Sequence, residues 1–576
     1  MTVTAQPTVE GAVLRLPPLT LTIPAGAAGR VRWGVDAPMV AGTLKWTLAV
    51  RSSDGKAKDS VVATQEVTPA VPVEVWAASL LRVGDPAPTI GVPMGALPGG
   101  YVDIAFSDTL AAPLDGVRGY MTDYPYNCFE QRLSRIVVLG DTGSWTVLAG
   151  AMPTYLDSDG LLRYWPNQEM KGSPELTAYV LAITSAAGLP IPDQSRARMV
   201  AALQGVVEGR LTRDRAYRAD ERLLRIAALS ALARAGAADP GLVARIDVVP
   251  VDMPTSALAQ WLVTLDRLPG APRAAQLRAA AEGELRRRLV YEGTRLDLTD
   301  RDNAPWWMMT SSDEMAILAL DAVIGKPGWS AEVPKMMVGA AARQMRGHWD
   351  TTPANAWGVI ASRRFNAAYP ASAVAGNTRV SLGSAAFNVS WPRSATAAPT
   401  RLPLLAGPLA MTQTGGAGPW ATVTVRAAVP LTAPLMAGYR LTRSVTVVSA
   451  RDKAKLSQGD VVRVRLTIEA SAERNWVVVS EPLPPGAVVM SGLGGQSAIL
   501  QQGEKSEGAY PAYSEGTREA WRAYYDWLPR GTSVIEYTLR LNSAGRFTLP
   551  PARVEAMYAP AIRAQVPVAP VTVWAF

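Results

Sequence analysis

The only cysteine of the chain, Cys128, is followed three positions later by Gln131. At the first turn of a helix, side chains at positions i and i+3 lie on one face. The sulfur of Cys128 can therefore reach the side-chain carbonyl carbon of Gln131 and displace ammonia. The product is an internal thioester, an activated acyl group that is transferred to an amine or hydroxyl. The alternative is an unreactive cysteine that packs as a small hydrophobic residue.

Composition argues against several other chemistries. With one histidine, His348, and one cysteine, the chain has neither a zinc-ligand spacing nor a recognisable Ser-His pair. We therefore expect no metal and no cofactor, and we expect His348 to be structural, at a helix end. The net charge of +8 comes from 57 basic and 49 acidic residues spread along the chain, so nucleic acid is not an expected partner.

The N-terminal residues, the apolar runs and the length of the chain each give an expectation. The N-terminal residues do not have the pattern of a signal peptide. The sequence also lacks an uninterrupted apolar run of about 18 residues that would span a bilayer. A chain of 576 residues is expected to divide into several domains.

Residues 1–116 alternate apolar and polar side chains in a way that predicts β-strands, with turn signals between them. The expected strands are 14–16, 19–23, 30–35 and 44–50. Several short strands at this spacing are typical of a β-sandwich.

From 117 to 372 the hydrophobic period becomes helical. Ser173 with Pro174, and Asp220, have the residue types preferred at helix starts. The expected helices cover 174–188, 194–210, 220–235, 254–268, 271–291, 311–324, 333–346 and 353–364. A series of helical hairpins without strands fits an α/α-toroid, in which inner and outer helices alternate around a closed ring.

Strands resume after about residue 373. The stretches 378–382, 387–391 and 421–425 are expected to pair with strands before residue 117 and to complete one β-domain around the helical insertion. A final β-domain is expected from 434 to the end, with a strand over 461–468.

Residues 124–131 resemble the thioester motif of the bacterial alpha-2-macroglobulins, Tyr-Pro-x-Gly-Cys-x-Glu-Gln. The matching residues are Tyr124, Pro125, Cys128, Glu130 and Gln131. Tyr126 fills the variable position, and Asn127 replaces the usual glycine. Asparagine tolerates a left-handed backbone better than most residues, so we expect the turn before the cysteine to be kept.

Three further stretches are similar to parts of the same family. Residues 159–166 with 176–179 resemble its glycine-aromatic-tryptophan turn and the following Thr-Ala-Tyr helix. Residues 348–357 resemble its late Trp-x-Thr-Thr-x-x-Asn helix start, and residues 554–560 resemble part of its C-terminal domain.

The resemblance implies a multidomain α and β protein, in which β-sandwich macroglobulin-like and CUB-like domains flank an inserted α/α-toroid thioester domain. Residues 1–116 would hold the last macroglobulin-type domain and the first part of the CUB-like domain. The toroid would cover 117–372, the second part of the CUB-like domain 373–433, and a receptor-binding-like macroglobulin domain 434–576.

A thioester hydrolyses in water, and the family shields it where the helical and C-terminal domains meet. Candidates for this shielding are Trp165, Trp306, Trp307, Tyr524, Tyr525 and Trp527. Ordinary core packing is the alternative for each of them. Glu130 would either orient Gln131 or remain solvated.

In complement proteins a histidine takes over the acyl group and directs it to hydroxyls. The corresponding loop here, before residue 311, contains no histidine, and Asn303 is the candidate modulator of acyl transfer. Without a histidine, the thioester is expected to prefer amines such as lysine side chains.

By this resemblance the chain is the C-terminal part of a periplasmic, broad-spectrum endopeptidase inhibitor. A target protease would cut a bait region, the thioester would be exposed, and a protease lysine would be acylated by Gln131 in a single turnover without enzymatic catalysis. The bait, the preceding macroglobulin domains and any lipid anchor to the inner membrane would lie outside this chain.

Two other functions are compatible with the sequence. One is a complement-like or adhesin-like module that acylates surface amines or hydroxyls without trapping proteases. The other is a toroid enzyme acting on carbohydrate or isoprenoid substrates, which would need paired carboxylates in the toroid cavity. No convincing pair of this kind is evident in the sequence.

Overall fold

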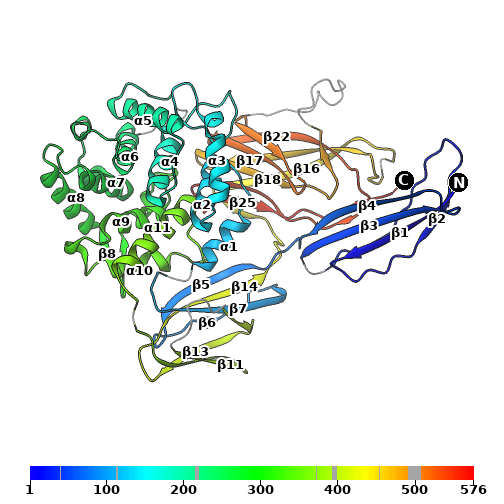
Figure 1. Cartoon of the computed structure of the whole chain (residues 1–576), viewed down its shortest axis with the longest axis horizontal. Helices are drawn as coiled ribbons and strands as arrows, with labels where there is room; N and C mark the ends of the chain where they lie inside the picture. Colours follow the sequence, from blue (N-terminus) through cyan, green and yellow to red (C-terminus); the bar gives the residue numbers. More distant parts are fainter. Residues whose placement is uncertain are drawn as a thin grey trace. The chain divides into compact units, whose positions relative to one another are not determined.

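The computed structural model describes residues 1–38, 41–111, 114–214, 220–371, 373–391, 399–452, 454–490 and 508–575. The chain forms two compact units, Met1–Val73 and Glu74–Phe576, which are described separately. Figure 1 shows the helices gathered in the middle of the sequence, between two regions of β-structure.

The unit Met1–Val73 contains one antiparallel sheet in the order β2-β1-β3-β4. Its strands are β1 (Thr2–Glu10), β2 (Leu19–Thr22), β3 (Gly42–Ser52) and β4 (Lys58–Val67). The described part of this unit is therefore a single sheet, whereas the sequence pattern predicts a sandwich.

Two strands predicted in this unit are wrong, since residues 14–16 and 30–35 lie outside its strands. The first stretch runs into Pro17 and Pro18, which lack the N–H donors that a sheet ladder needs. The second is held through a side chain instead, because Trp33 donates from Nε1 to the carbonyl of Pro17 at 2.8 Å.

The second unit begins with a β-sandwich built from two separate segments of the chain. One sheet, in the order β12-β7-β14-β5, contains β5 (Glu74–Arg82), β7 (Leu97–Ser107), β12 (Thr400–Pro403) and β14 (Trp420–Ala428). The other, in the order β11-β10-β13-β6, contains β6 (Thr89–Ile90), β10 (Gly376–Leu382), β11 (Ala385–Trp391) and β13 (Gly407–Thr414).

The two segments are joined by antiparallel strand pairs across the helical insertion. β14 pairs with both β5 and β7, β12 pairs with β7, and β13 pairs with β6. Side chains from both sheets share one core, which includes Val102, Ile104, Val380, Leu382 and Val423. The strands after residue 373 thus pair with those before residue 117, as the sequence predicts.

The helical segment lies between β7 and β10. Its helices are α1 (Asp115–Asp123), α2 (Phe129–Leu139), α3 (Thr142–Tyr155), α4 (Pro174–Ala187), α5 (Asp193–Glu208), α6 (Glu221–Arg234), α7 (Thr255–Arg267), α8 (Ala274–Arg288), α9 (Ser312–Val323), α10 (Val333–Ala342) and α11 (Thr352–Ala368). The predicted caps are present, because Ser173 accepts from the N–H of Leu176 and Asp220 accepts from that of Arg222.

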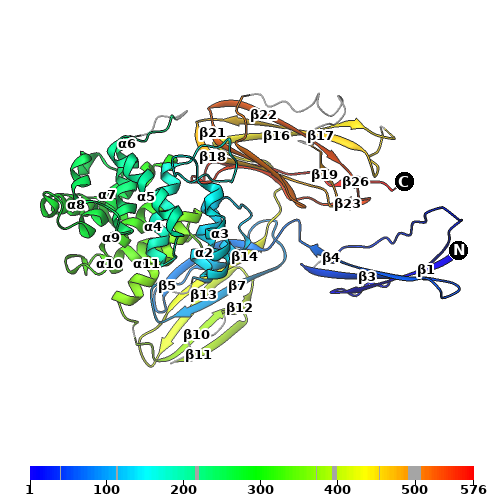
Figure 2. The same ribbon diagram turned by 45° about the horizontal axis from the view of Figure 1, so that its top comes forward.

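Six of these helices follow one another in a closed circuit of contacts. α2 packs against α4, α4 against α6, α6 against α7, α7 against α9, α9 against α11, and α11 returns to α2. The helices α3, α5, α8 and α10 each pack against members of this circuit. Figure 2 shows the same group of helices from a second direction.

The prediction that this segment lacks strands is wrong. The strands β8 (Leu289–Glu292) and β9 (Arg295–Leu298) form a hairpin directly after α8. The expected helix over 271–291 ends early because Val290 and Tyr291, near its end, have residue types that favour strands. Gly293 then turns the chain with a φ of 64°, a left-handed angle that suits glycine.

The C-terminal part consists of two facing sheets and a small pair of strands. One sheet, in the order β16-β17-β22-β19, contains β16 (Tyr439–Ser449), β17 (Val461–Ala470), β19 (Val488–Val489) and β22 (Gly531–Arg540). The other, β15-β25-β24-β18-β21-β20, contains β15 (Leu435–Ala437), β18 (Arg474–Pro482), β20 (Tyr513–Gly516), β21 (Ala520–Leu528), β24 (Ala552–Ala556) and β25 (Arg563–Val566). The small pair is β23 (Gly545–Phe547) with β26 (Val571–Val573).

The six-stranded sheet is apolar on both faces. In β18, Val477 and Val479 belong to the core between the two C-terminal sheets, whereas Trp476 and Val478 belong to the core of the helical segment. Successive side chains of a strand point to opposite faces, so one strand serves both cores. The C-terminal sheet thereby closes one side of the helical segment.

Gly358 in α11 tests the packing of the helical segment. An added Cβ would overlap the ring of Trp349, which is 1% exposed and donates from Nε1 to the carbonyl of Ala340 at 2.7 Å. We expect Gly358→Ala to lower the free energy of unfolding by about 2 kcal/mol through overpacking. The measurement is urea unfolding followed by helical circular dichroism.

Gly283 in α8 provides the matched control. It is exposed and an added Cβ would meet nothing within 4 Å. Gly283→Ala should therefore stabilise the protein by about 0.5 to 1 kcal/mol, the usual gain of alanine over glycine within a helix. If both substitutions stabilise the protein, Gly358 does not pack tightly against the ring of Trp349.

Candidate functional site

Cys128 lies at the N-cap of α2, where Gln131 is the third helical residue. The backbone N–H of Cys128 donates to the side-chain oxygen of Gln131 at 3.0 Å. In return, the sulfur faces the backbone N–H of Gln131, which completes a capping box. The two side chains that could form a thioester are therefore neighbours across one turn, and both are fully buried.

The surroundings keep the Cys128 sulfur protonated when it is a free thiol. Burial raises the pKa of Cys128 well above its usual value, and the nearby Glu130 carboxylate raises it further. Backbone N–H groups at the start of the helix lower the pKa, but they do not outweigh burial. A thiolate is therefore disfavoured at this position as long as the site stays closed.

Glu130 is fully buried and is held by hydroxyl groups from three parts of the fold. Ser134 of α2 donates to Oε1 at 2.6 Å, and Thr352 at the start of α11 donates at 2.8 Å. Tyr558 of the C-terminal part donates to Oε2 at 3.0 Å. Tyr179 of α4 hydrogen-bonds Ser134 at 2.6 Å and extends the network. The alternative that Glu130 remains solvated is therefore wrong.

Burial raises the pKa of Glu130 from 4.5 to about 7, although the three hydroxyl donors lower it in part. The carboxyl group is thus poised between its neutral and ionised forms near neutral pH. The hydroxyl donors favour the ionised form, because each can donate to a carboxylate oxygen.

The C-terminal part also reaches Gln131. The side-chain nitrogen of Gln131 lies 4.0 Å from the sulfur of Met557, whose backbone N–H donates to the carbonyl of Trp476 at 2.9 Å. Trp476 is buried and has a φ of 49°, a left-handed backbone that is unfavourable for a bulky residue. The fold holds this residue against the helical segment despite that cost.

An aromatic cluster covers this junction. Trp165 lies 4.6 Å from Tyr524 and 4.9 Å from Tyr513, between ring centroids, and Tyr164 lies 3.8 Å from Trp476. The backbone N–H of Phe129, next to the cysteine, donates to the carbonyl of Tyr164 at 2.9 Å. Rings from the helical and C-terminal parts thus pack together directly beside Cys128.

The other shielding candidates occupy different places. Tyr525 follows Tyr524 in β21 and therefore points into the core between the C-terminal sheets. Trp527, farther along β21, is partly exposed. Trp306 and Trp307 are also partly exposed, and the carbonyl of Trp307 accepts from the side-chain nitrogen of Asn475 at 3.2 Å.

The residues before the cysteine form a chain of aromatic contacts. Tyr124 lies 5.4 Å from Tyr126, and Tyr126 lies 6.1 Å from Tyr524, between ring centroids. Pro125 separates the two tyrosines in the loop between α1 and α2. The left-handed turn that motivated our interpretation of Asn127 is absent, because Asn127 is not among the described residues with a positive φ.

The remaining candidates lie in and near the loop before α9. Asn303 is exposed in a short 3-10 turn, whereas Met309 of the same loop is buried and accepts from the hydroxyl of Tyr164 at 2.9 Å. His348 stacks on Tyr120 at 3.6 Å, and burial lowers its pKa to about 4. His348 therefore packs as a neutral ring.

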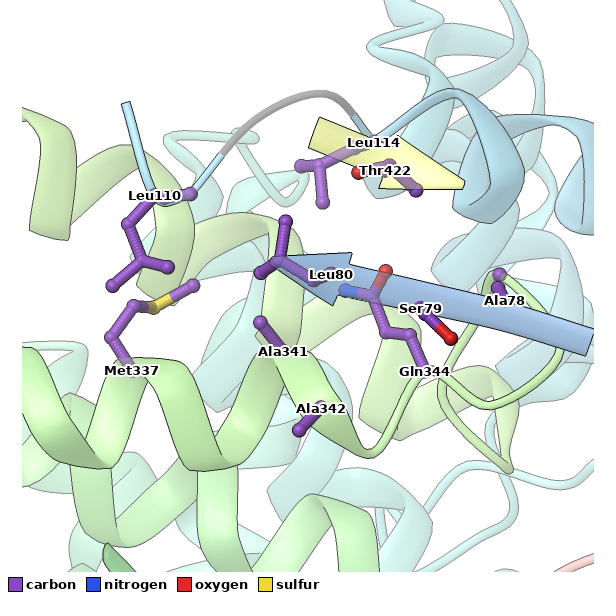
Figure 3. Close-up of a pocket in the computed structure, with 12 residues that line it drawn as sticks. Ala78, Ser79, Leu80, Leu110, Leu114, Met337, Ala341, Ala342, Gln344 and Thr422 are labelled. Carbon is purple, nitrogen blue, oxygen red and sulfur yellow. The ribbon is translucent and has the colours of Figure 1, made fainter. Parts of the chain in front are cut away.

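The structure contains a small cavity at another junction. Figure 3 shows this cavity, of about 30 Å³, between β5 and the end of α10, with Leu80, Leu110 and Met337 in its walls. A volume of this size holds about one or two water molecules. None of the predicted site residues is among the described residues that line it.

The described residues contain no group of three or more His, Cys, Asp or Glu side chains that could hold a metal ion. Among the same residues, no helix has the length and apolar character of a membrane span.

Several contributors to the site were not identified as site residues from the sequence. They are Ser134, Tyr164, Tyr179, Thr352, Trp476, Tyr513, Met557 and Tyr558. Five of these, Tyr164, Tyr179, Thr352, Met557 and Tyr558, lie in stretches that carry the family resemblance. That resemblance was the signal that could have found them, because no local spacing relates them to Cys128.

The raised pKa of Glu130 predicts a pH dependence of stability. The folded protein binds this proton more tightly than the unfolded chain, so stability is lost as the pH rises from about 4.5 through 7. Relative to Glu130→Gln, the wild-type protein should lose about 3 kcal/mol across this window. The measurement is urea unfolding of both proteins at a series of pH values.

The comparison with Glu130→Gln is needed because burial also raises the pKa of Asp350 to about 7, and this group is present in both proteins. Parallel stability curves for the two proteins would show that Glu130 is already ionised at acidic pH in the folded state.

Comparisons with known proteins bear on the fold and on the C-terminal part. Residues 438–561 match the family model of the bacterial alpha-2-macroglobulin MG10 domain. A search of curated protein sequences gives no match.

Solved structures of similar fold include native alpha-2-macroglobulin from Escherichia coli spanning domain MG7 to the C-terminus. The TM-score is 0.75 at 17% identity, and the match covers 100% of this chain and 94% of that chain. Salmonella alpha-2-macroglobulin reacted with methylamine gives a TM-score of 0.72 at 18% identity, covering 100% of this chain and 38% of that chain. The native E. coli protein gives a TM-score of 0.72 at 17% identity, and the match covers 99% of this chain and 38% of that chain.

This chain thus spans nearly all of the E. coli fragment but little more than a third of the longer proteins. The resemblance seen in the sequence is confirmed. Residues 438–561 are similar to the bacterial alpha-2-macroglobulin MG10 domain, and the chain as a whole has the fold of the C-terminal portion of the E. coli protein.

Proposed function

We propose that this chain is the thioester-bearing C-terminal part of a periplasmic alpha-2-macroglobulin that traps endopeptidases covalently. The observation that carries the proposal is the position of Cys128 and Gln131, buried in one capping box beneath the MG10 domain. Two side chains that can form a thioester are adjacent, and the part of the chain that covers them matches the MG10 family model.

The chemistry follows from these two residues. The sulfur of Cys128 attacks the side-chain carbonyl carbon of Gln131, the C–N bond breaks, and ammonia leaves. An amine that later reaches the same carbon forms an amide with Gln131, while the C–S bond breaks and the sulfur leaves as a thiolate. The products are an acylated amine and one free thiol.

Burial accounts for the latency of such a bond. The closed site disfavours a thiolate at Cys128, so cleavage of the C–S bond is slow while the MG10 domain covers it. Removal of that domain would admit water to the sulfur and restore its ordinary acidity. The nucleophile would then reach the thioester, and the same opening would make the sulfur of Cys128 a better leaving group.

We further propose that the thioester reacts with amines, including lysine side chains of the trapped protease. The loop before α9 presents Met309 to Tyr164 beside the site, and a thioether cannot take over an acyl group as a histidine can. The Salmonella relative was crystallised after reaction with methylamine, which is a simple amine.

The domain assignments extend the same proposal. The closed circuit of α2, α4, α6, α7, α9 and α11 supports an α/α-toroid thioester domain over 117–372. Residue 372 itself lies outside the described residues. The sandwich around this insertion supports a CUB-like domain that ends near 433, followed by the C-terminal macroglobulin domain over 434–576.

Intact mass tests the thioester directly. We expect freshly isolated protein to be lighter than its sequence mass by one ammonia, about 17 Da, because ring closure expels it. A thiol reagent should find no reactive group until methylamine is added, and one thiol per chain should then appear. Incubation with an endopeptidase should give a conjugate that survives denaturation.

Two variants serve as controls for this prediction. Cys128→Ala should have full mass and release no thiol, at a cost in stability of about 1 kcal/mol. Gln131→Asn shortens the acyl side chain, so it should have full mass and a thiol that reacts only after denaturation. Wild-type protein with full mass and an immediately reactive thiol would contradict the proposal.

A further inference from the structure

One arginine of α2 hydrogen-bonds the loop that leads into Cys128 at several points. This loop, residues 124–128, lies between α1 and α2 and has no regular secondary structure. The carbonyl of Cys128 accepts from the backbone N–H of Arg132, but those of Tyr124 and Tyr126 lack the partners that a helix or sheet would provide. Buried carbonyls without partners are costly.

Arg135 supplies these partners. Its Nε donates to the carbonyl of Met121 at 2.9 Å, and one terminal nitrogen, Nη2, donates to the carbonyls of Tyr124 and Tyr126. The other terminal nitrogen, Nη1, donates to the side-chain oxygen of Asn127 at 3.1 Å. One guanidinium group thereby binds the last turn of α1 and the loop as far as the residue before Cys128.

The position of Arg135 in the sequence makes this contact possible. It follows Cys128 by seven residues, about two helical turns, so its side chain lies on the same side of α2 as the loop. Its planar fork of N–H donors can serve several acceptors at fixed angles, which a lysine ammonium cannot do as well. The group is half-buried, and its charge strengthens each hydrogen bond.

Asn127 acquires a role in this arrangement. The usual glycine of the family motif is replaced here by a residue whose φ is not positive. Its side chain instead adds an acceptor for Arg135. The substitution therefore connects the residue directly before the cysteine to the helix that carries Gln131.

We propose that Arg135 is a positioning residue, which fixes the loop before Cys128 and thereby holds the sulfur against the side chain of Gln131 and away from water. This inference rests on the proposed thioester. It adds to that proposal a residue that touches neither reacting side chain and acts through the loop alone.

The test measures the lifetime of the thioester in amine-free buffer, followed by the appearance of a titratable thiol and by intact mass. We expect Arg135→Gln to shorten the half-life of the thioester about tenfold or more, because a loosened loop lets the sulfur and the acyl carbon drift from their aligned positions. Arg135→Lys should give an intermediate half-life, since lysine keeps the charge but not the fork.

Arg132 provides a matched control on the same helix. Its side-chain Nη1 donates to the hydroxyl of Tyr155 at 3.3 Å, and its backbone N–H, which a substitution keeps, donates to the carbonyl of Cys128. Arg132→Gln should leave the half-life within about twofold of the wild-type value. A similar shortening in both glutamine variants would indicate a general loss of charge or helix stability and would overturn the positioning role.

A double-mutant cycle separates positioning from a loss of folding. Asn127→Ala should shorten the half-life in the wild-type background and have little further effect when Arg135 is already glutamine, because the two residues act through one contact. Additive effects would contradict that coupling. If Arg135→Gln does not fold, the same cycle is carried out with Arg135→Lys.

The outcomes distinguish this inference from the proposed function. Wild-type protein with the mass deficit and Arg135→Gln with an unchanged half-life would overturn the positioning role alone. Wild-type protein of full mass would overturn the thioester, and the positioning role with it.

Discussion

The buried carboxyl group of Glu130 is the constraint on which the site depends. A buried ionised group is costly unless hydrogen bonds compensate for the lost water. Its three hydroxyl donors come from α2, α11 and the C-terminal part. Glu130, beside the proposed thioester, thus keeps all three hydrogen bonds only while these segments are together. Separation of the C-terminal part would remove the Tyr558 hydroxyl and admit water to the carboxylate.

The C-terminal sheet meets this constraint through its two faces. Tyr524 and Trp476 lie on the face toward the helices, while Tyr525 and Val477 lie on the face toward the second sheet. The same strands therefore stabilise their own domain and cover Cys128. Removing the cover would expose a large apolar and aromatic surface on both sides of the junction, which gives the closed state a substantial hydrophobic contribution.

The sequence carried enough information to predict the helical insertion, its caps and the pair Cys128 and Gln131. These features depend on local spacing, because a cap or an i and i+3 pair involves residues of one turn. The partners of Glu130 depend on tertiary structure instead, since Thr352 is 222 residues away and Tyr558 is 428 residues away. Similarly, the sequence alone does not determine which of Tyr524 and Tyr525 faces the helices. The β8 and β9 hairpin was missed because its short strands follow a helix without a strong break.

The sandwich assembled from two chain segments has a mechanical consequence. The helical segment leaves this body after β7 and returns to it at β10, strands that lie in different sheets of the sandwich. A domain on one flexible linker can tumble and sample a large volume. A domain tethered at both ends to one rigid body loses most of that freedom and is confined to swinging about the line between its two attachment points. The paired strands also hold the two ends of the helical segment together. A single break in the polypeptide within that segment would therefore leave both fragments attached to the same sandwich.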